Sequence, residues 1–154
     1  MNMKILILSD SHGAYPALIQ AFEREKPDYV LFLGDGSRDA ERLFEKSGAT
    51  PVCRVSGNCD LMDDQPDTKL LDVAGIRIAM THGHRFGVKS GLASYAMYAE
   101  KVGASVALYG HTHAANCERR GGVLLVNPGA AVNGKYAVLT ADGNIGVTFG
   151  DIYE

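Results

Sequence analysis

All five histidines of this chain lie in short clusters that also hold aspartate, asparagine or glycine. The clusters are Asp10-Ser11-His12, Gly34-Asp35, Gly57-Asn58, Thr81-His82-Gly83-His84 and Gly110-His111-Thr112-His113. Aspartate and histidine are ligands that suit Zn, Mn or Fe, and asparagine supplies a neutral carbonyl oxygen. An isolated histidine is more often a hydrogen-bonded core or surface residue, but that explanation does not account for the joint clustering. The clusters therefore predict a metal site.

The spacing of the donors and the glycines beside them also favour metal binding. Asp10 and His12 are two residues apart, and so are His111 and His113. Residues i and i+2 of an extended segment project to the same side, so each pair could hold one ion. Glycine lets the backbone bend sharply beside a metal, and it occurs in or next to these clusters at Gly13, Gly34, Gly36, Gly57, Gly83 and Gly110.

The elements that must position these clusters alternate between strand and helix in the first third of the chain. Three apolar runs indicate buried strands, namely Lys4–Leu8, Tyr29–Leu33 and Pro51–Val55. Between them, residues 16–26 form a predicted helix with Pro in its first turn, and residues 38–46 form another that Ser37 caps and Gly48 closes. This order implies a parallel sheet. Ligands gather outside the carboxyl ends of such strands, so the clusters should converge there.

The remainder of the chain is richer in hairpin signals. Turn dipeptides separate three pairs of strands, which are Thr68–Val73 with Ile76–Thr81, Cys117–Arg120 with Val123–Asn127, and Lys135–Thr140 with Ile145–Phe149. A helix over residues 91–102 and a short buried strand over residues 106–109 lie between the first two pairs. Two packed mixed sheets covered by helices would satisfy both halves of the chain.

Length and composition exclude several classes of protein. The 154 residues, 46% of them hydrophobic, are expected to form one domain over residues 1–154. The net charge of −3, with scattered Lys and Arg, argues against a nucleic-acid backbone as the main partner. No run approaches 18 apolar residues, so no membrane span is expected. Three cysteines without CxxC spacing, Cys53, Cys59 and Cys117, favour a reducing cytoplasm.

Taken in order, the motifs D-x-H, GD, GN, H and GHxH between Asp10 and His113 resemble those of the calcineurin-like metallophosphoesterase family. The resemblance is closest to the short bacterial and archaeal phosphodiesterases, which are similar to this chain nearly end to end. Asn127-Pro128-Gly129 is also similar to that subgroup. The resemblance implies an α/β fold, specifically a four-layer α/β/β/α sandwich of two mixed β-sheets flanked by helices. It also implies a metal-dependent phosphodiesterase.

The resemblance further implies a role for each donor. One ion would be held by Asp10, His12 and His113, the other by Asn58, His82 and His111, and Asp35 would bridge the two. A hydroxide that bridges two divalent ions would attack the phosphorus of a small phosphate ester. Mn is the ion we expect first, and Fe, Zn or Ni would tolerate the same ligands. Small relatives often form dimers or larger assemblies, so self-association is a further expectation.

Three other positions bear on catalysis and substrate binding. Many family members carry histidine directly after GN to assist the leaving group, whereas this chain has Cys59 in a GNCD form that the close subgroup shares. Cysteine is a much poorer source of positive charge, and we expect Cys59 only to fill its loop. Asn58 could also donate its NH₂ to a phosphate oxygen. His84 lies outside the seven implied ligands and could contact substrate or orient His82, or be a loop residue.

Arginines near the motif loops are further candidates for substrate binding. Arg38, Arg54 and Arg85 could clamp a second phosphate group, although solvated surface arginines are the commoner case. Of these, Arg85 is the predicted substrate contact.

Four alternatives remain open from the sequence. The family includes non-catalytic, retromer-type scaffolds, but all seven ligand positions here hold suitable residues. A nucleotide-binding fold would need GxGxxG or GxxxxGK[ST] after the first strand, where this chain has Ser9-Asp10-Ser11-His12-Gly13. A nuclease would use the same chemistry, but this chain lacks the run of basic residues that would bind a long nucleic acid. A phosphomonoesterase would share the site, and the preference for a diester rests on the subgroup resemblance.

Overall fold

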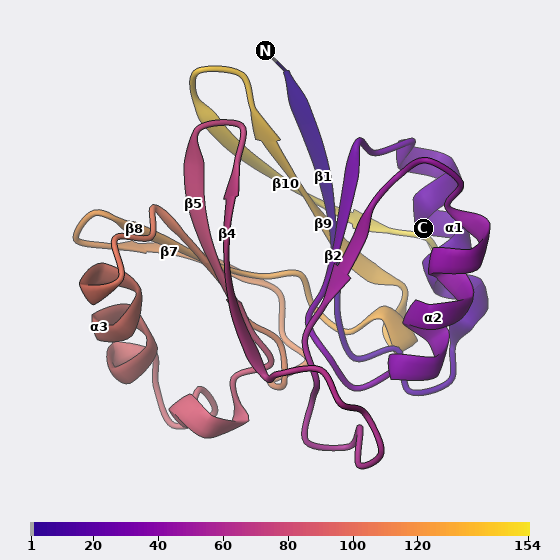
Figure 1. The fold of residues 1–154 in the computed structure, drawn as a ribbon, viewed down its shortest axis with the longest axis horizontal. Helices are drawn as coiled ribbons and strands as arrows, with labels where there is room; N and C mark the ends of the chain where they lie inside the picture. Colours follow the sequence, from indigo (N-terminus) through magenta and orange to yellow (C-terminus); the bar gives the residue numbers. More distant parts are fainter. Residues whose placement is uncertain (1) are drawn as a thin grey trace.

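Two five-stranded β-sheets lie face to face in the computed structural model, which describes residues 2–154 (Figure 1). The first sheet contains, in spatial order, β10 (Ile145–Asp151), β9 (Lys135–Ala141), β1 (Met3–Leu8), β2 (Tyr29–Phe32) and β3 (Val52–Arg54). Strands β1, β2 and β3 are parallel, whereas β9 and β10 run antiparallel to their neighbours. The predicted β-α-β-α-β unit therefore supplies three of the five strands of this sheet.

The second sheet is also mixed. Its strands are β4 (Thr68–Val73), β5 (Ile76–Thr81), β6 (Val106–Leu108), β8 (Val123–Asn127) and β7 (Asn116–Arg120), again in spatial order. β5, β6 and β8 are parallel, and β4 and β7 are antiparallel edge strands. The three predicted hairpins are confirmed as β4–β5, β7–β8 and β9–β10. The second sheet thus has a parallel centre and a hairpin at each edge, whereas the first has a hairpin at one edge and parallel strands up to the other.

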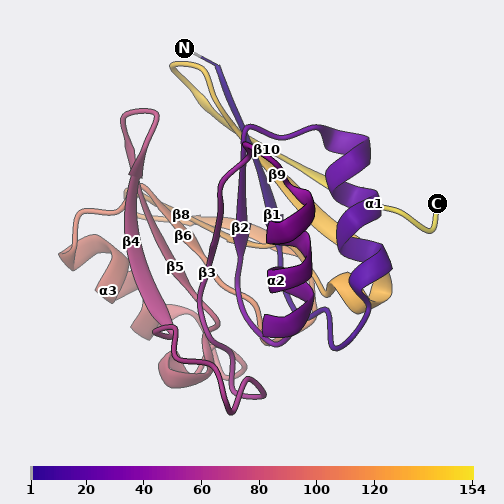
Figure 2. The same cartoon turned by 45° about the vertical axis from the view of Figure 1, so that its right-hand side comes forward.

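Helices cover the outer face of each sheet. α1 (Tyr15–Glu25) and α2 (Ser37–Lys46) pack on the first sheet, and α3 (Ala93–Lys101) packs on the second, at opposite sides of the molecule in Figures 1 and 2. Two short 3₁₀ turns, η1 (His84–Phe86) and η2 (Ala131–Asn133), follow strands β5 and β8. The predicted α/β/β/α sandwich is therefore confirmed. No helix among residues 2–154 has the length and apolar character needed to cross a membrane.

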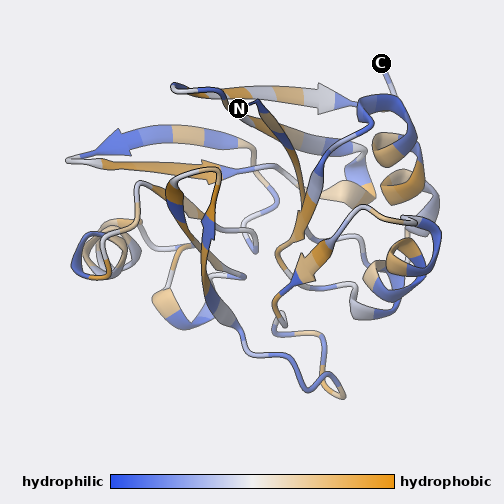
Figure 3. Ribbon diagram, turned by 45° about the horizontal axis from the view of Figure 1, so that its top comes forward, coloured by the Kyte–Doolittle hydropathy of each residue, from blue (hydrophilic) through white to orange (hydrophobic). Residues whose placement is uncertain are grey.

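Alternation along β1 explains why its run of aliphatic residues is continuous. Leu6 and Leu8 pack toward α1 and α2, whereas Ile5 and Ile7 pack between the two sheets, and all four are at most 1% exposed. A strand buried on both faces needs apolar residues at every position. In Figure 3 the hydrophobic colour is accordingly concentrated on the interior strands, and the hydrophilic colour lies on the outward sides of the helices.

The start of α2 differs from the prediction. Ser37 is the first residue of the helix and not its cap, Gly36 precedes it, and no side-chain cap bond is made there. Instead the carboxylate of Asp60, 23 residues further along the chain, accepts the N–H groups of Gly36 and Ser37 at 3.0 and 3.1 Å. The cap is supplied by a tertiary contact, which local sequence does not encode.

Candidate metal centre

The parallel strands bring six of the seven predicted ligands together at one edge of the sandwich. Asp10 and His12 follow β1, Asp35 follows β2, His82 follows β5, and the remaining two follow β6, namely His111 and His113. Two hydrogen bonds join the sheets at this edge, from the His111 amide to Asp10 Oδ2 (3.1 Å) and between His82 Nδ1 and the Leu33 carbonyl (2.7 Å). The convergence expected from the strand ends is present.

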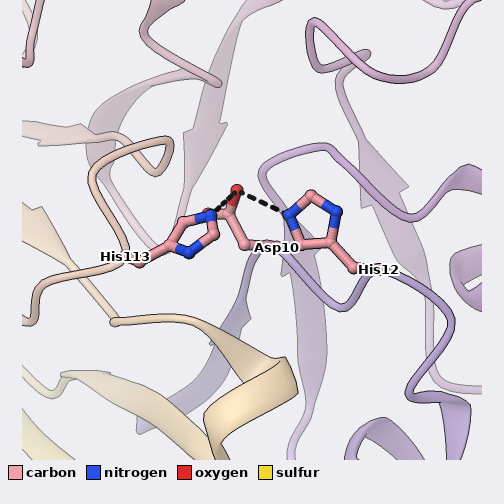
Figure 4. Close-up of side chains that lie close together, drawn as sticks. All are labelled: Asp10, His12 and His113. Carbon is pink, nitrogen blue, oxygen red and sulfur yellow. Dashed lines mark ion pairs between the residues drawn. The ribbon is translucent and has the colours of Figure 1, made fainter.

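Asp10 lies at the centre of this cluster. Its Oδ1 is 3.3 Å from His113 Nε2, 3.7 Å from His82 Nε2 and 3.8 Å from His12 Nε2. Figure 4 shows His12 and His113 approaching this oxygen from opposite sides. The two rings come from loops about 100 residues apart in sequence, so only the fold brings them to one atom.

Asp35 lies between two sets of histidines. Its Oδ2 is 3.3 Å from His82 Nε2 and 3.8 Å from His12 Nε2. Among the described residues, donor atoms within 4.8 Å of one another form three groups: Asp10, His12 and His113; His12, Asp35 and Cys59; and Asp35, His82 and His111. The family pattern implies the first and third groups. Asp35 joins them, as a bridging ligand would.

Two buried polar atoms in the cluster have no hydrogen-bond partner, Asp10 Oδ1 and His82 Nε2. The other oxygen of Asp10 accepts hydrogen bonds from Ser9 Oγ (2.7 Å) and from the His111 amide (3.1 Å). In the neutral His82 ring, donation from Nδ1 to the Leu33 carbonyl leaves a lone pair on Nε2. Burial opposes a charge on His82, but Asp35 and Asp10 outweigh it and raise its pKa when no metal is bound, so an ion would have to displace that proton. A buried polar atom without a hydrogen-bond partner costs free energy unless another group, such as a metal ion, contacts it. The donor set and these two atoms fit a bound cation.

Electrostatics in the cluster favour the ligand forms of Asp35 and His111. Burial opposes ionisation of Asp35, but His82, the Cys59 amide and His12 outweigh it and hold the pKa of the carboxyl well below its usual value. Burial, together with the positive charge available on His82, lowers the pKa of His111. Metal ligands must be deprotonated, so an ionised Asp35 and a neutral His111 are the states that bind.

Backbone strain is concentrated on the predicted ligands. Seven non-glycine residues among those described have positive φ, and five of them are Asp10 (56°), His12 (43°), Asp35 (62°), His111 (71°) and His113 (65°). Such conformations cost about 1–3 kcal/mol each and persist where surrounding structure imposes them. The sharp bends therefore fall on the ligands themselves as well as on the neighbouring glycines.

This geometry corrects the expectation of one ion for each pair of donors two residues apart. Asp10 and His12 do belong to one group, but His111 and His113 belong to different groups. All four of these residues have positive φ, so neither pair has the extended backbone that the i, i+2 argument assumed, and the packing of each loop decides which group its donors join.

Three carboxylate and amide side chains that the sequence did not single out as site residues hold the loops in place. Asp60 Oδ2 accepts the amides of Asp35 and Gly57, both at 2.8 Å. Asp39 accepts Ser11 Oγ (2.5 Å) and the Gly13 amide (2.8 Å). The carboxylates thus fix the loops after β1, β2 and β3 to one another. The signal for Asp60 was its place in the GNCD motif; Asp39 carried none.

Asn127 is the third of these side chains and is fully buried. Its Nδ2 donates to the Gly110 carbonyl (3.2 Å) and to Thr112 Oγ1 (2.9 Å), and its Oδ1 accepts the Gly129 amide (2.9 Å). It therefore supports the loop that carries His111. The Asn-Pro-Gly motif noted in the sequence has a structural basis here.

Close packing against the cluster explains two of the glycines without positive φ. A Cβ on Gly57 would lie 2.2 Å from Asp35 Oδ1, and a Cβ on Gly110 would lie 2.1 Å from Ser9 Oγ. Any side chain at either position would displace the polar groups beside it.

Asn58, the remaining predicted ligand, lies in the loop after β3. It is exposed, and its Nδ2 makes one hydrogen bond among the described residues, to Cys59 Sγ at 3.6 Å. The adjacent Cys59 amide donates to Asp35 Oδ1 at 2.8 Å, so the Asn58 loop is anchored beside the cluster. Burial and nearby Asp35 raise the pKa of the Cys59 thiol, which supplies no positive charge.

His84 and Arg85 lie at different distances from the cluster. The His84 ring centroid is 5.6 Å from that of His82 and 6.2 Å from that of His111, and burial lowers its pKa. Its Nδ1 is buried without a hydrogen-bond partner. The Arg85 side chain is 73% exposed and pairs with Asp67. Both residues line a pocket of about 390 Å³ with Asn58.

Comparison with known proteins decides the family. Residues 3–144 match the profile of the calcineurin-like phosphoesterase superfamily domain. The chain belongs to this superfamily. It is 37% identical over 128 residues to the probable metallophosphoesterase YsnB of Bacillus subtilis, covering 83% of this chain and 75% of YsnB. It is 32% identical over 155 residues to the phosphodiesterase YfcE of Escherichia coli, covering 83% of this chain and 79% of YfcE.

Solved structures share the fold. A conserved uncharacterised protein from Streptococcus pneumoniae, described as a predicted phosphoesterase, superposes with a TM-score of 0.85 at 26% identity, covering 98% of this chain and 90% of that protein. Vps29 from Entamoeba histolytica, crystallised with Zn²⁺, superposes with a TM-score of 0.74 at 20% identity, covering 97% of this chain and 99% of Vps29. The second likeness shows the fold alone. The relatives in Bacillus subtilis and Escherichia coli are named as a metallophosphoesterase and a phosphodiesterase.

Proposed function

We propose that this protein is a phosphodiesterase that hydrolyses a small phosphate diester with two divalent metal ions. The observation that carries the proposal is a pair of buried ligand atoms without hydrogen-bond partners, Asp10 Oδ1 and His82 Nε2. Both lie inside a cluster of carboxylates and imidazoles. A purely structural cluster would satisfy these atoms with hydrogen bonds. Burying these two atoms without hydrogen-bond partners costs free energy, and a bound cation would offset that cost.

The residues would divide between two ion sites. Asp10, His12 and His113 would hold one ion, as their grouping supports. Asp35, His82 and His111 would hold the other, and Asp35 would contact both because its Oδ2 lies between His12 and His82. Asn58 would complete the second site after a rotation of its side chain away from Cys59.

The chemistry follows from what each group can do. Bound divalent ions lower the pKa of a shared water toward neutrality and neutralise charge on phosphate oxygens. Asp10 and Asp35 supply negative charge that is held in place by Ser9 and by the His111 and Cys59 amides. Asn58 would donate its NH₂ to a phosphate oxygen, and His84, kept neutral by its lowered pKa, would accept or donate a hydrogen bond to substrate. No side chain has to form a covalent intermediate.

Further details of the proposal concern the substrate, the ion and the setting. The names of curated relatives support a diester over a monoester. The two pockets that flank the cluster, of about 440 and 390 Å³, suit small substituents on either side of a phosphate. We propose Mn²⁺ as the ion used, with Fe, Zn or Ni as substitutes. Three free cysteines support a reducing cytoplasm, and self-association is proposed from the resemblance.

A non-catalytic scaffold is the second candidate function. The sequence motifs leave it open, because the family that they resemble includes such scaffolds. The ligand positions weigh against it, since Asp10, His12, Asp35, Asn58, His82, His111 and His113 all carry donors and six of them converge. A non-catalytic scaffold would need neither backbone strain at these residues nor buried polar atoms without hydrogen-bond partners.

A metal-reconstituted activity screen separates these functions. The purified protein is stripped with chelator, reloaded with Mn²⁺, Fe²⁺, Zn²⁺ or Ni²⁺, and assayed on bis(4-nitrophenyl) phosphate and on 4-nitrophenyl phosphate. We expect metal-dependent turnover that is faster on the diester. Faster turnover of the monoester would replace the diesterase assignment with a phosphatase. No turnover of either compound with any ion would favour the scaffold.

A further inference from the structure

The larger pocket, of about 440 Å³, opens directly from the metal centre. Its floor includes His12 and Asp35, and its walls extend over the start of α2 to Arg38 and along the loop of residues 55–67 to Met62. That loop is the one that projects beyond the sheets at the bottom of Figures 1 and 2. A group attached to a phosphate bound at the centre would therefore have this space available.

Arg38 is the one lysine or arginine among the residues that line this pocket. It is exposed and makes no ion pair with any residue in the described part of the chain. The other two arginines near the motif loops are engaged. Arg54 pairs with Asp63 at 2.9 Å and Arg85 pairs with Asp67. Their ion pairs thus distinguish Arg54 and Arg85 from Arg38, whereas the sequence favoured Arg85.

The carboxylates in the pocket wall do not neutralise Arg38. Asp39 is buried and bonds to Ser11 and Gly13, and Asp60 accepts backbone amides of the loops after β2 and β3. Asp35 faces the metal centre. Each acidic group of the wall is already committed elsewhere, so the charge of Arg38 is available to a ligand.

Two apolar side chains that also line this pocket are highly exposed. Leu61 is 87% exposed and Met62 is 98% exposed, and both directly follow Asp60, whose carboxylate accepts the Gly57 amide at 2.8 Å. They can cover the carbon skeleton of a bound group, which exposed apolar side chains beside a site commonly do.

We propose that this pocket binds the ester group of the substrate and that Arg38 selects esters carrying a second anionic group, a carboxylate or phosphate. The inference rests on the proposed phosphodiesterase function. Arg38 would make a charge-assisted hydrogen bond to that anion, while Met62 and Leu61 contact the skeleton between the two anions. Arg38 is a specificity residue in this scheme, because it touches the substrate away from the reacting phosphorus.

A matched pair of non-hydrolysable ligands tests the proposal by equilibrium binding. Phenylphosphonate and 4-carboxyphenylphosphonate differ by one carboxylate, and calorimetry gives their dissociation constants on Mn²⁺-loaded protein. We expect wild type to bind the carboxylated compound about fivefold more tightly, the upper range for one solvent-accessible ion pair. R38Q should abolish this preference while leaving the affinity for phenylphosphonate within about twofold.

Three further variants separate Arg38 from other causes. R42Q removes a charge one turn along α2, from an arginine that stacks on the Tyr15 ring at 3.9 Å, and should keep the preference. R85Q removes the cation of the other pocket and should also keep it. M62S should weaken both phosphonates to a similar extent, because it removes contact with the ring that they share.

Two results would overturn the assignment. If wild type binds the two compounds equally, Arg38 is rejected as the selecting residue and the phosphodiesterase assignment stands. The same conclusion follows if R38Q keeps the preference and R85Q or R42Q loses it. Failure of wild type to bind either phosphonate, together with no diester hydrolysis in the metal screen, rejects the proposed function and the pocket assignment with it.

Discussion

Asp60 offers the sharpest test of how the site is held together. Its carboxylate accepts four backbone N–H groups, from Asp35 and Gly57 at Oδ2 (both 2.8 Å) and from Gly36 and Ser37 at Oδ1 (3.0 and 3.1 Å). It therefore joins the loop after β3 to the loop after β2 and caps α2. D60N keeps the size of the side chain and replaces one acceptor oxygen with a donor.

The expected cost follows from the number of amides left without an acceptor. With NH₂ in place of one oxygen, two of the four N–H groups face a donor. A buried unsatisfied donor costs about 1–3 kcal/mol, and water reaches part of this half-buried site, so we expect a total loss of about 2–3 kcal/mol. For a chain of this size that corresponds to a fall in Tm of about 4–12 °C.

Urea denaturation of the metal-free protein, followed by circular dichroism, measures this loss. D64N is the control, since Asp64 is an exposed carboxylate of the same loop without a hydrogen bond in the described residues, and it should stay within about 0.5 kcal/mol of wild type. D60N should also weaken Mn²⁺ binding, because the Asp35 amide loses its acceptor. A D60N protein as stable as D64N would refute the role assigned to Asp60.

Other predictions follow from the same contacts. His111→Ala should weaken binding of one ion by at least about 10–100-fold and remove activity, as measured by Mn²⁺ titration and turnover; normal turnover at full occupancy would exclude His111 as a ligand. Cys59→Ser should keep most activity, because its backbone amide, not its thiol, holds Asp35; complete loss in a folded variant would reveal a chemical role for the thiol. Asn127→Ala should lower the free energy of unfolding by about 1–3 kcal/mol, since it leaves the buried Gly129 amide without an acceptor; a neutral effect would mean that water replaces the Asn127 side chain. Burial disfavours the Asp63 charge, but Arg54 outweighs it and holds the pKa below its usual 3.8. The pair therefore stabilises the protein above that pH and is lost as the pH falls through the folded value, so Asp63→Asn should lose less stability than wild type on acidification.

The fold was largely accessible from the sequence because its strands and helices carry strong periodic signals. Runs such as Ile5–Leu8 are buried on both faces, and only a strand between two layers has that requirement. Turn dipeptides such as Ala74-Gly75, both with positive φ, set the hairpins. These features depend on residues that are close together along the chain, so they can be recognised in a single sequence.

The arrangement inside the site was less accessible because it depends on contacts between distant residues. The spacing of His111 and His113 suggested one shared ion, but the folded chain places them in different groups. Ser37 had the chemistry of a helix cap, yet Asp60 supplies the cap from another loop. Nothing local distinguishes a carboxylate that accepts four amides from one that is solvated, so only the folded chain reveals it.

The metal content of the reconstituted protein tests the central claim most directly. Chelator-stripped protein is equilibrated with excess Mn²⁺, desalted, and measured by elemental analysis against protein concentration, with His113→Ala measured in parallel. Two ions per chain in wild type, and about one in the variant, are the expected values. A wild-type content near zero, or one that His113→Ala leaves unchanged at two, would contradict a two-metal site built on these residues.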